Sequence, residues 1–136
     1  MHLARVIPFS LPRGAEMLEE LTRIAEKEKI TTALVSAIGA LNSGALGYYD
    51  LTQRQYLSRE FTQRMELISC TGNISLRDRK PWPHLHCVVS DKDGQTMGGH
   101  LLIAEVFLVE GFLLLMDAPI ERLPDPESGL TRWHLP

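Results

Sequence analysis

A turn signal between two histidine-bearing runs constrains the fold of this chain more than any other feature. The signal is Asp91-Lys92-Asp93-Gly94, and it separates Pro-His-Leu-His-Cys-Val-Val from Met-Gly-Gly-His-Leu-Leu. Gly94 suits the left-handed position of a three-residue hairpin loop, which pairs Asp91 with Gln95. We therefore predict two antiparallel strands, about 84–90 and 96–103, joined by this loop.

The register of this hairpin brings three histidines to one face of the sheet. Side chains alternate between the two faces of a strand, so His84 and His86 share a face and Cys87 takes the other. His86 lies directly opposite His100 in this register, with the two Cβ atoms about 5 Å apart. Three imidazoles that leave a fourth position open are a ligand set of catalytic zinc sites. The sequence thus predicts a metal site at these three histidines.

Two alternatives to this metal site stay open. A loop of two or four residues would shift the register by one and send His100 to the opposite face, and a bulge at Gly98-Gly99 would also change it. Incidental clustering is the second alternative, because His-x-His spacing also occurs in proteins without metal. The turn chemistry decides between these readings.

Composition predicts one soluble domain of 136 residues, with 44% hydrophobic and 23% charged residues. No apolar run approaches the roughly 20 residues that cross a bilayer, and no secretory signal is visible, so we expect no membrane contact and a cytoplasmic location. Cys70 and Cys87 lack Cys-x-x-Cys spacing and are expected to be buried reduced thiols. The net charge of −3 opposes attraction to nucleic acid.

Periodicity predicts an α/β (more narrowly α+β) domain: a mostly antiparallel sheet with one main amphipathic helix packed on it. The helix is expected over residues 15–28, where apolar residues recur at the helical period. Turn-forming residues at Gly39, Asn42-Ser43-Gly44 and Thr71-Gly72-Asn73 separate the expected strands. Besides the hairpin, the strands are 31–38, 45–50, 55–61, 64–70 and 105–116, the last being one strand or two bent around Gly111.

The expected domain spans residues 1–136, with a core of about 5–118. Residues 119–136 form a proline-rich, irregular or extended C-terminal extension, although residues 130–134 could add a short strand.

A small-molecule site would also need groups that handle protons or bind a substrate. Glu66 and Glu105 lie in expected strands, and Arg13 or Arg64 could bind a carboxylate. Tyr48 alternates with its neighbour, so it could line a pocket or a subunit contact. The plain alternative for both glutamates is an outward position on the polar side of the sheet.

The order of several segments resembles the "plants and prokaryotes conserved" (PPC) domain over roughly residues 5–118. The matching segments are Pro12-Arg-Gly-Ala-Glu-Met-Leu-Glu-Glu-Leu21, Ser36-Ala-Ile-Gly-Ala-Leu41, Leu46-Gly-Tyr-Tyr-Asp50, Glu66-Leu-Ile-Ser-Cys-Thr-Gly-Asn-Ile74, Pro83-His-Leu-His86 and Asp93 through Leu101. This resemblance implies a compact α/β domain that assembles as a homotrimer. It also implies that His84, His86 and His100 bind a divalent metal, commonly zinc. The fold looks similar to that of acetolactate decarboxylase, a three-histidine zinc enzyme.

Three functional hypotheses follow from these observations. The first is a trimeric metal-binding domain that binds a small ligand or acts in regulation, and the second is a zinc-dependent lyase or hydrolase acting on a small acidic metabolite. The third is DNA binding, which plant proteins resembling this domain perform through a separate Arg-Gly-Arg-Pro type AT-hook. The nearest segment here, Arg77-Asp-Arg-Lys-Pro81, lacks the glycine and carries an acidic residue, so it does not supply that insertion into the minor groove.

Overall fold

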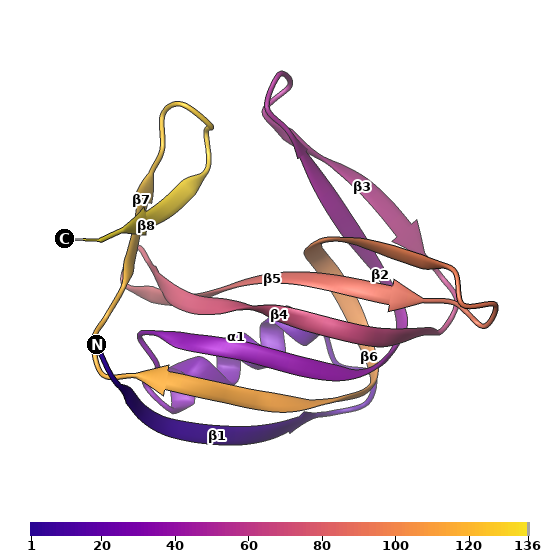
Figure 1. Cartoon of the computed structure of the whole chain (residues 1–136), viewed down its shortest axis with the longest axis horizontal. Coiled ribbons are helices and arrows are strands. Elements are labelled where there is room, and N and C mark those ends of the chain that lie inside the picture. Colours follow the sequence, from indigo (N-terminus) through magenta and orange to yellow (C-terminus); the bar gives the residue numbers. More distant parts are fainter. Residues whose placement is uncertain (136) are drawn as a thin grey trace.

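A bent, mostly antiparallel sheet forms most of the molecule, and a single α-helix lies across one of its faces (Figure 1). The computed structural model describes residues 1–135. Because the structure combines this sheet with a packed helix, it confirms the expected α+β class and the mostly antiparallel sheet. The elements are β1 (Leu3–Leu11), α1 (Met17–Lys27), β2 (Ala33–Asp50), β3 (Gln55–Phe61), β4 (Met65–Arg77), β5 (Lys80–Ser90), β6 (Thr96–Met116), β7 (Glu121–Pro124) and β8 (Thr131–His134).

Two long strands, β2 and β6, organise the sheet. β2 pairs with β3, β4 and β6, while β6 pairs with β1, β2 and β5. Because β4 also pairs with β5, the four strands β2, β6, β5 and β4 form a closed circuit of pairings. Register shifts at Ala40/Leu41, Leu41/Ser43 and Ala45/Leu46 mark where the β2–β6 ladder is irregular. Such bulges bend and twist strands, and so allow this closure.

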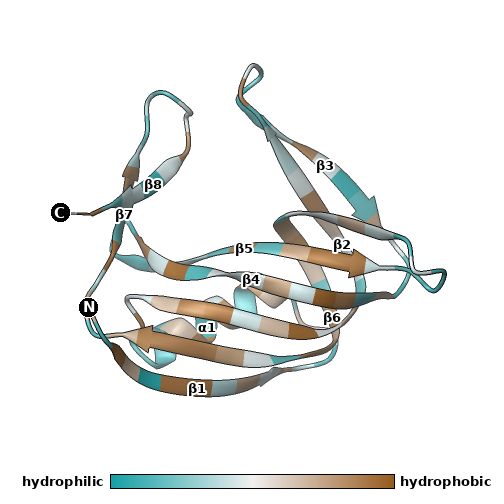
Figure 2. Cartoon of the chain, in the orientation of Figure 1, coloured by the Kyte–Doolittle hydropathy of each residue, from teal (hydrophilic) through white to brown (hydrophobic). Residues whose placement is uncertain are grey.

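The hydrophobic core lies between α1 and the sheet. Met17, Leu21 and Ala25 form the buried stripe of α1, and Glu16 caps the helix by accepting a hydrogen bond from the Glu19 amide at 2.8 Å. Figure 2 shows how apolar and polar residues alternate along the strands. The apolar side chains that meet the helix side are buried, among them Val35, Ile74, Leu85, Val106 and Leu113.

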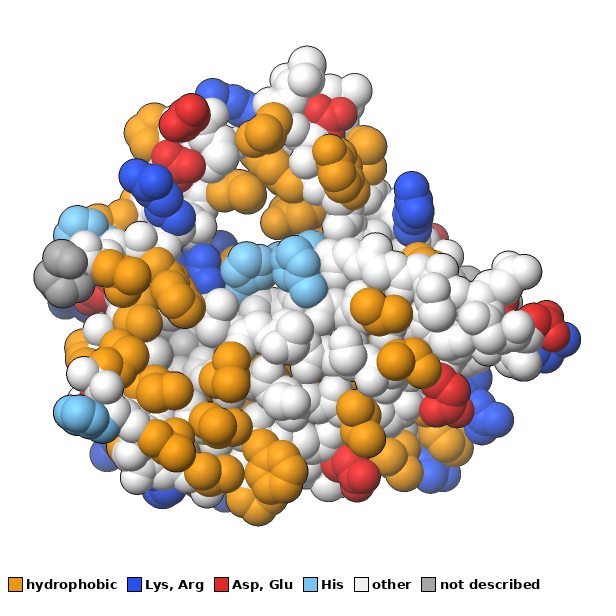
Figure 3. All heavy atoms as spheres, in the orientation of Figure 1, with side chains coloured by type: hydrophobic (Ala, Val, Ile, Leu, Met, Phe, Trp, Pro, Cys, Tyr) orange, Lys and Arg blue, Asp and Glu red, His pale blue; other side chains and the backbone are white. Residues whose placement is uncertain are grey.

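The opposite face of the sheet leaves large apolar side chains uncovered. Val6, Leu34, Ile38 and Phe112 are 44–57% exposed although they lie in strands. Neighbours such as Val35 and Leu113 are fully buried, so the period of two places these exposed residues on the face away from α1. The space-filling view shows hydrophobic side chains gathered on this face (Figure 3). We call this surface the open sheet face.

The strand boundaries correct several expectations. Asn42-Ser43-Gly44 lies inside one continuous β2, and Thr71-Gly72-Asn73 lies inside β4, so neither segment ends a strand. β6 is likewise one strand that runs through Gly111. β1 was not expected, and residues 119–135 contribute a small β7–β8 hairpin rather than only an irregular extension. No helix in residues 1–135 is long and apolar enough to cross a membrane.

Candidate metal centre

The β5–β6 hairpin has the loop that the sequence predicts. Gly94 adopts φ 79°, and the Asp91 amide donates to the Gln95 carbonyl at 2.9 Å. The Gly94 amide donates to the Asp91 carbonyl at 3.1 Å, which closes the turn. The Asp91 carboxylate also accepts hydrogen bonds from the amides of Asp93 and Gln95, both at 2.9 Å. These contacts fix the register, and the expected pairing of His86 with His100 is confirmed.

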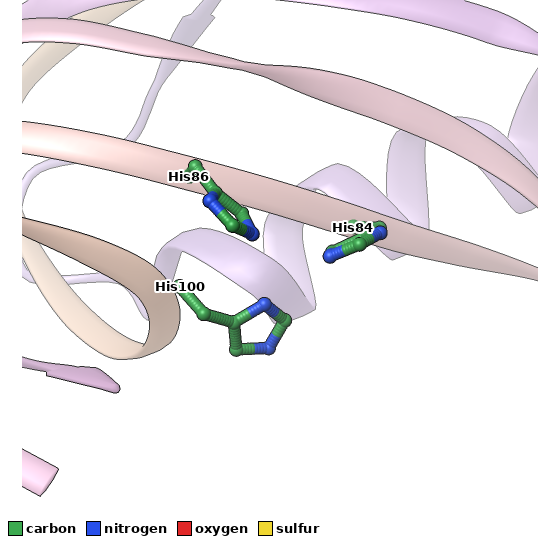
Figure 4. A group of neighbouring side chains, drawn as sticks. All are labelled: His84, His86 and His100. Carbon is green, nitrogen blue, oxygen red and sulfur yellow. The ribbon is translucent and has the colours of Figure 1, made fainter. Parts of the chain in front are cut away.

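The three predicted histidines come together on the sheet. Each ring offers one nitrogen, and these three atoms lie within 4.8 Å of one another. Ring centroids are 5.2 Å apart for His84 and His86, 5.1 Å for His84 and His100, and 5.5 Å for His86 and His100. Figure 4 shows one nitrogen of each ring directed toward the other two rings. Zinc–nitrogen bonds of about 2.0–2.1 Å place tetrahedral ligands about 3.3 Å apart, so the three nitrogens would draw closer together around a bound ion.

The protonation state of the rings suits metal binding. Burial, with the nearby Arg122 guanidinium and the other two rings, lowers the pKa of His84 to about 4. Burial and the nearby His86 lower the pKa of His100 to about 4. Both imidazoles are therefore neutral at pH 7 and have a lone pair to donate, as a metal ligand requires.

One ring nitrogen has no partner within residues 1–135. His100 Nδ1 is buried and makes no hydrogen bond, whereas buried polar atoms in proteins almost always have a partner. The ring itself is held by stacking on Tyr56, with the centroids 4.7 Å apart and the planes 18° apart. An unsatisfied nitrogen on a fixed ring beside two further imidazoles fits a ligand atom for an ion.

Arg122 of β7 is a site residue that the sequence did not reveal. Its guanidinium donates to the side chains of Asn73 and Ser75, both at 2.7 Å, and lies 3.2 Å from His84 Nδ1. Because a guanidinium only donates, it disfavours the protonated form of His84. Arg122 and His84 are 38 positions apart in sequence, and the pairing of β7 with β4 brings them together.

A cavity of about 230 Å³ opens beside His84 and His100. Its roof belongs to two hairpins, β2–β3 and β7–β8, that meet at their tips. Tyr49 donates to the Ser128 carbonyl at 2.8 Å, and Arg54 donates to the Pro126 and Glu127 carbonyls at 3.2 and 3.1 Å. Histidine side chains lie below this roof in the space-filling view (Figure 3). The lining residues are Tyr56, Arg77, Trp82, His84, His100, Arg122, Gly129, Leu130 and Thr131.

The other residues expected at the site lie elsewhere on the chain. Glu66 pairs with Ser90 at the far end of β5, and Glu105 accepts a hydrogen bond from Asn42 at 2.8 Å near the start of α1. Arg64 lies over the Phe107 ring, 4.8 Å from its centroid, and so does Arg13 at 4.4 Å. Tyr48 is 69% exposed, whereas its neighbour Tyr49 faces the cavity roof. A ligand role for Glu66, Glu105, Arg64 and Tyr48 stays a prediction.

The cysteines follow the expectation from the sequence. Cys70 and Cys87 are buried free thiols, and the two residues lie opposite each other on β4 and β5. Cys87 is 2% exposed in the core, on the opposite side of β5 from His86. Neither thiol belongs to the histidine cluster.

Comparison with known families supports the resemblance seen in the sequence. The model of the Plants and Prokaryotes Conserved (PCC) domain, called PPC above, matches residues 2–115. Among curated proteins, the bifunctional protein GlmU from a Synechococcus strain is 30% identical over 135 residues. That alignment covers 96% of this chain but only 20% of the relative, so the chain spans about a fifth of the curated protein.

Solved structures with the same fold include a metal-containing protein from Archaeoglobus fulgidus. It is 36% identical with a TM-score of 0.92, over 98% of this chain and 96% of that one. A PPC protein from Pyrococcus horikoshii is 35% identical with a TM-score of 0.93, over 98% and 94% of the two chains. A Staphylococcus aureus protein similar to α-acetolactate decarboxylase shares the fold more distantly, at 13% identity and a TM-score of 0.59 over 86% and 54%. The expected similarity of fold to that enzyme is confirmed.

Proposed function

Because this chain belongs to the Plants and Prokaryotes Conserved domain family, we propose that it is a homotrimeric metal protein that binds a small ligand. His84, His86 and His100 would hold the ion, and zinc fits their chemistry best. The observation that carries this proposal is the convergence of three imidazoles, one of which has a buried nitrogen without a partner. A similar protein of Archaeoglobus fulgidus is described as metal-containing, which supports the proposal.

The donor set defines what the centre can do. Three imidazole ligands would leave one coordination position of a tetrahedral ion free, and a bound ion would polarise an oxygen atom of a ligand there. The residues of the chain supply position and environment. Tyr56 holds the ring of His100 by stacking, and Arg122 holds that of His84 through Nδ1. The adjoining cavity gives a ligand room next to two of the three rings.

The cavity lining favours ligand binding over catalysis. An enzyme acting on a small acidic metabolite would need a proton-handling group near the ion. Among residues 1–135 no carboxylate lines this cavity, although Tyr56 and two arginines do. A zinc-dependent lyase or hydrolase is the second candidate, supported by these arginines and by the distant fold likeness to an acetolactate decarboxylase-like protein.

DNA binding is the weakest of the three hypotheses. A similar protein from Ralstonia eutropha, 28% identical over 95% of this chain, is described as a candidate DNA-binding protein. The net charge here is −3, and the AT-hook sequence is absent. We expect no electrophoretic shift of non-specific duplex at physiological salt, because phosphate neutralisation drives such binding. A shift that persists at that salt would support the DNA hypothesis instead.

Replacement of one histidine tests the metal centre. We expect about one zinc ion, or a similar divalent metal ion, per chain in the purified protein. The His86→Ala variant should lose that ion, because two imidazoles do not complete the ligand set. His134→Ala is the matched control, since this exposed histidine lies on β8 outside the cluster. Elemental analysis of the three proteins gives the answer. Absence of metal from both the parent and the control would contradict the proposal.

The open sheet face supports the proposed trimer. Monomers seldom leave a large contiguous apolar patch open to water. The open sheet face exposes such a patch, formed by Val6, Leu34, Ile38 and Phe112. We expect light scattering to give the mass of a trimer, and Phe112→Lys to reduce it because a charge would be buried at the contact. Leu51→Lys is the control, since Leu51 is 66% exposed in the β2–β3 turn. A stable monomer in the parent would count against assembly.

A further inference from the structure

We propose that the cavity beside the histidines binds a small anion with a carboxylate or phosphate group, held by Arg122 and Arg77. This inference names the ligand class for the function proposed above and rests on it. The side chains that would contact the anion or support the site are Arg77, Arg122 and Trp82, which are cationic or aromatic. Arg122 lies beyond residues 2–115, the part that the family model matches.

Arg122 is a buried cation without a counter-charge among residues 1–135. Its side chain belongs to a residue only 6% exposed, and its partners are Ser75, Asn73, the Thr131 carbonyl and His84 Nδ1, none of which is charged. No carboxylate of residues 1–135 lies within 4.0 Å of the guanidinium. Buried charges in proteins are normally paired, because their desolvation is costly. An anion at the cavity wall would supply the missing partner.

A second arginine strengthens the positive charge of the same wall. Arg77 also lines the cavity, and both guanidinium groups lie over the ring of Trp82, at 4.7 Å for Arg77 and 4.8 Å for Arg122. The two guanidinium charges repel each other, because both lie over the same ring. The cation–π contacts with Trp82 offset part of this repulsion. They leave the net charge of the wall unchanged.

The size and setting of the cavity limit the ligand further. A volume of about 230 Å³ is below the roughly 300–1,000 Å³ of drug-sized sites, so a small metabolite fits and a polymer does not. With a divalent ion at the histidines, the site would carry two positive charges from the ion and two from the guanidinium groups. No carboxylate among the lining residues would balance them. Planar carboxylates and phosphates accept paired hydrogen bonds from arginine, which makes them the matching anions.

Binding of simple anions to the metal-loaded full chain tests the inference. We expect calorimetry to show one site per chain for oxalate or inorganic phosphate, with the stronger of the two defining the head group. Arg77→Gln should weaken binding at least tenfold while leaving the metal content unchanged, because Arg77 is exposed and does not belong to the histidine cluster. Arg79→Gln is the matched control, since this exposed arginine lies in the same turn and does not line the cavity.

The outcomes separate this inference from the metal proposal. The inference is overturned if the metal-loaded protein binds neither anion, or if Arg77→Gln binds the anions as tightly as the parent does. Either result leaves the proposed metal centre intact. A protein without metal overturns the proposed function, and Arg77-dependent anion binding in that protein would still support the cavity. Arg122→Gln removes the buried cation and should abolish binding. If that variant does not fold, Arg77→Gln decides the question alone.

Discussion

Gly72→Ala is expected to unfold the domain or to lower its free energy of unfolding by at least about 3 kcal/mol. A Cβ atom at Gly72 would lie 2.0 Å from the carbonyl oxygen of His84 and 2.9 Å from the Cα atom of Leu85. Both contacts are with backbone atoms, so no side-chain rotation relieves them. The β4–β5 ladder would have to separate at the peptide that carries a metal ligand. The folded fraction should therefore also lose metal affinity.

Gly98→Ala controls for the loss of glycine as such. Gly98 pairs with Val88 in the same sheet, and its added Cβ would meet the Cys87 carbonyl oxygen at 3.3 Å and a Val88 methyl carbon at 3.5 Å. These contacts need only small shifts, so we expect a change of less than about 1 kcal/mol. Urea unfolding followed by circular dichroism measures both variants. Equal stability of the Gly72→Ala and Gly98→Ala variants would show that β4 and β5 do not approach each other as closely at Gly72 as the structure indicates.

Removal of the metal is expected to lower the melting temperature by roughly 10 °C or more. An ion that binds only the folded state stabilises it by about 4 kcal/mol when its free concentration is about 1,000 times its dissociation constant. For a domain of this size, about 1 kcal/mol corresponds to a shift of a few degrees. The stabilisation arises because His84, His86 and His100 come from two strands, and one ion would join them. Thermal unfolding with and without a chelator measures the shift.

His100→Ala provides the control for the chelator experiment. This variant lacks one ligand and leaves the cavity beside Tyr56 larger, so its melting temperature should be lower than that of the metal-loaded parent. It should, however, not change when the chelator is added. A chelator effect of equal size in parent and variant would mean that the ion stabilises the fold from another site.

The histidine cluster was predictable because its geometry depends on short-range rules. The loop of residues 92–94 and the period of two along a strand suffice to pair His86 with His100. Both rules act within the same hairpin, so the pairing of these two residues does not depend on knowing the long-range packing. The helix was predictable for the same reason, since its apolar stripe is local.

The long strands were harder to predict because their continuity depends on tertiary pairing. Gly72 and Asn73 favour turns in isolation, yet in β4 they pair with β2 on one side and β5 on the other. Gly72 is required there by the close approach of the His84 carbonyl rather than by a turn. β1 contains Pro8, which suggests a loop, but β1 pairs only with β6, and an edge strand tolerates proline.

Arg122 could not be predicted from local patterns. Its partners Asn73, Ser75 and His84 belong to β4 and β5, and only the single parallel pairing of Leu76 with Glu121 brings β7 beside them. The sequence offers one weak signal: residues 130–134 could form a strand, and a strand at the end of a chain needs a partner. That partner is β7, and their pairing places Arg122 opposite Trp133.

The tip-to-tip contact between the two hairpins has a consequence for how a solute could enter and leave. Three hydrogen bonds join the tips, from Tyr49 and Arg54 to carbonyls of residues 126–128. Each is worth about 0.5–1.5 kcal/mol, or somewhat more for the charged donor, so parting the tips costs a few kcal/mol. None of the β5–β6 pairs that align the histidines needs to break. The two tips can therefore part while the strands that carry the histidines stay paired.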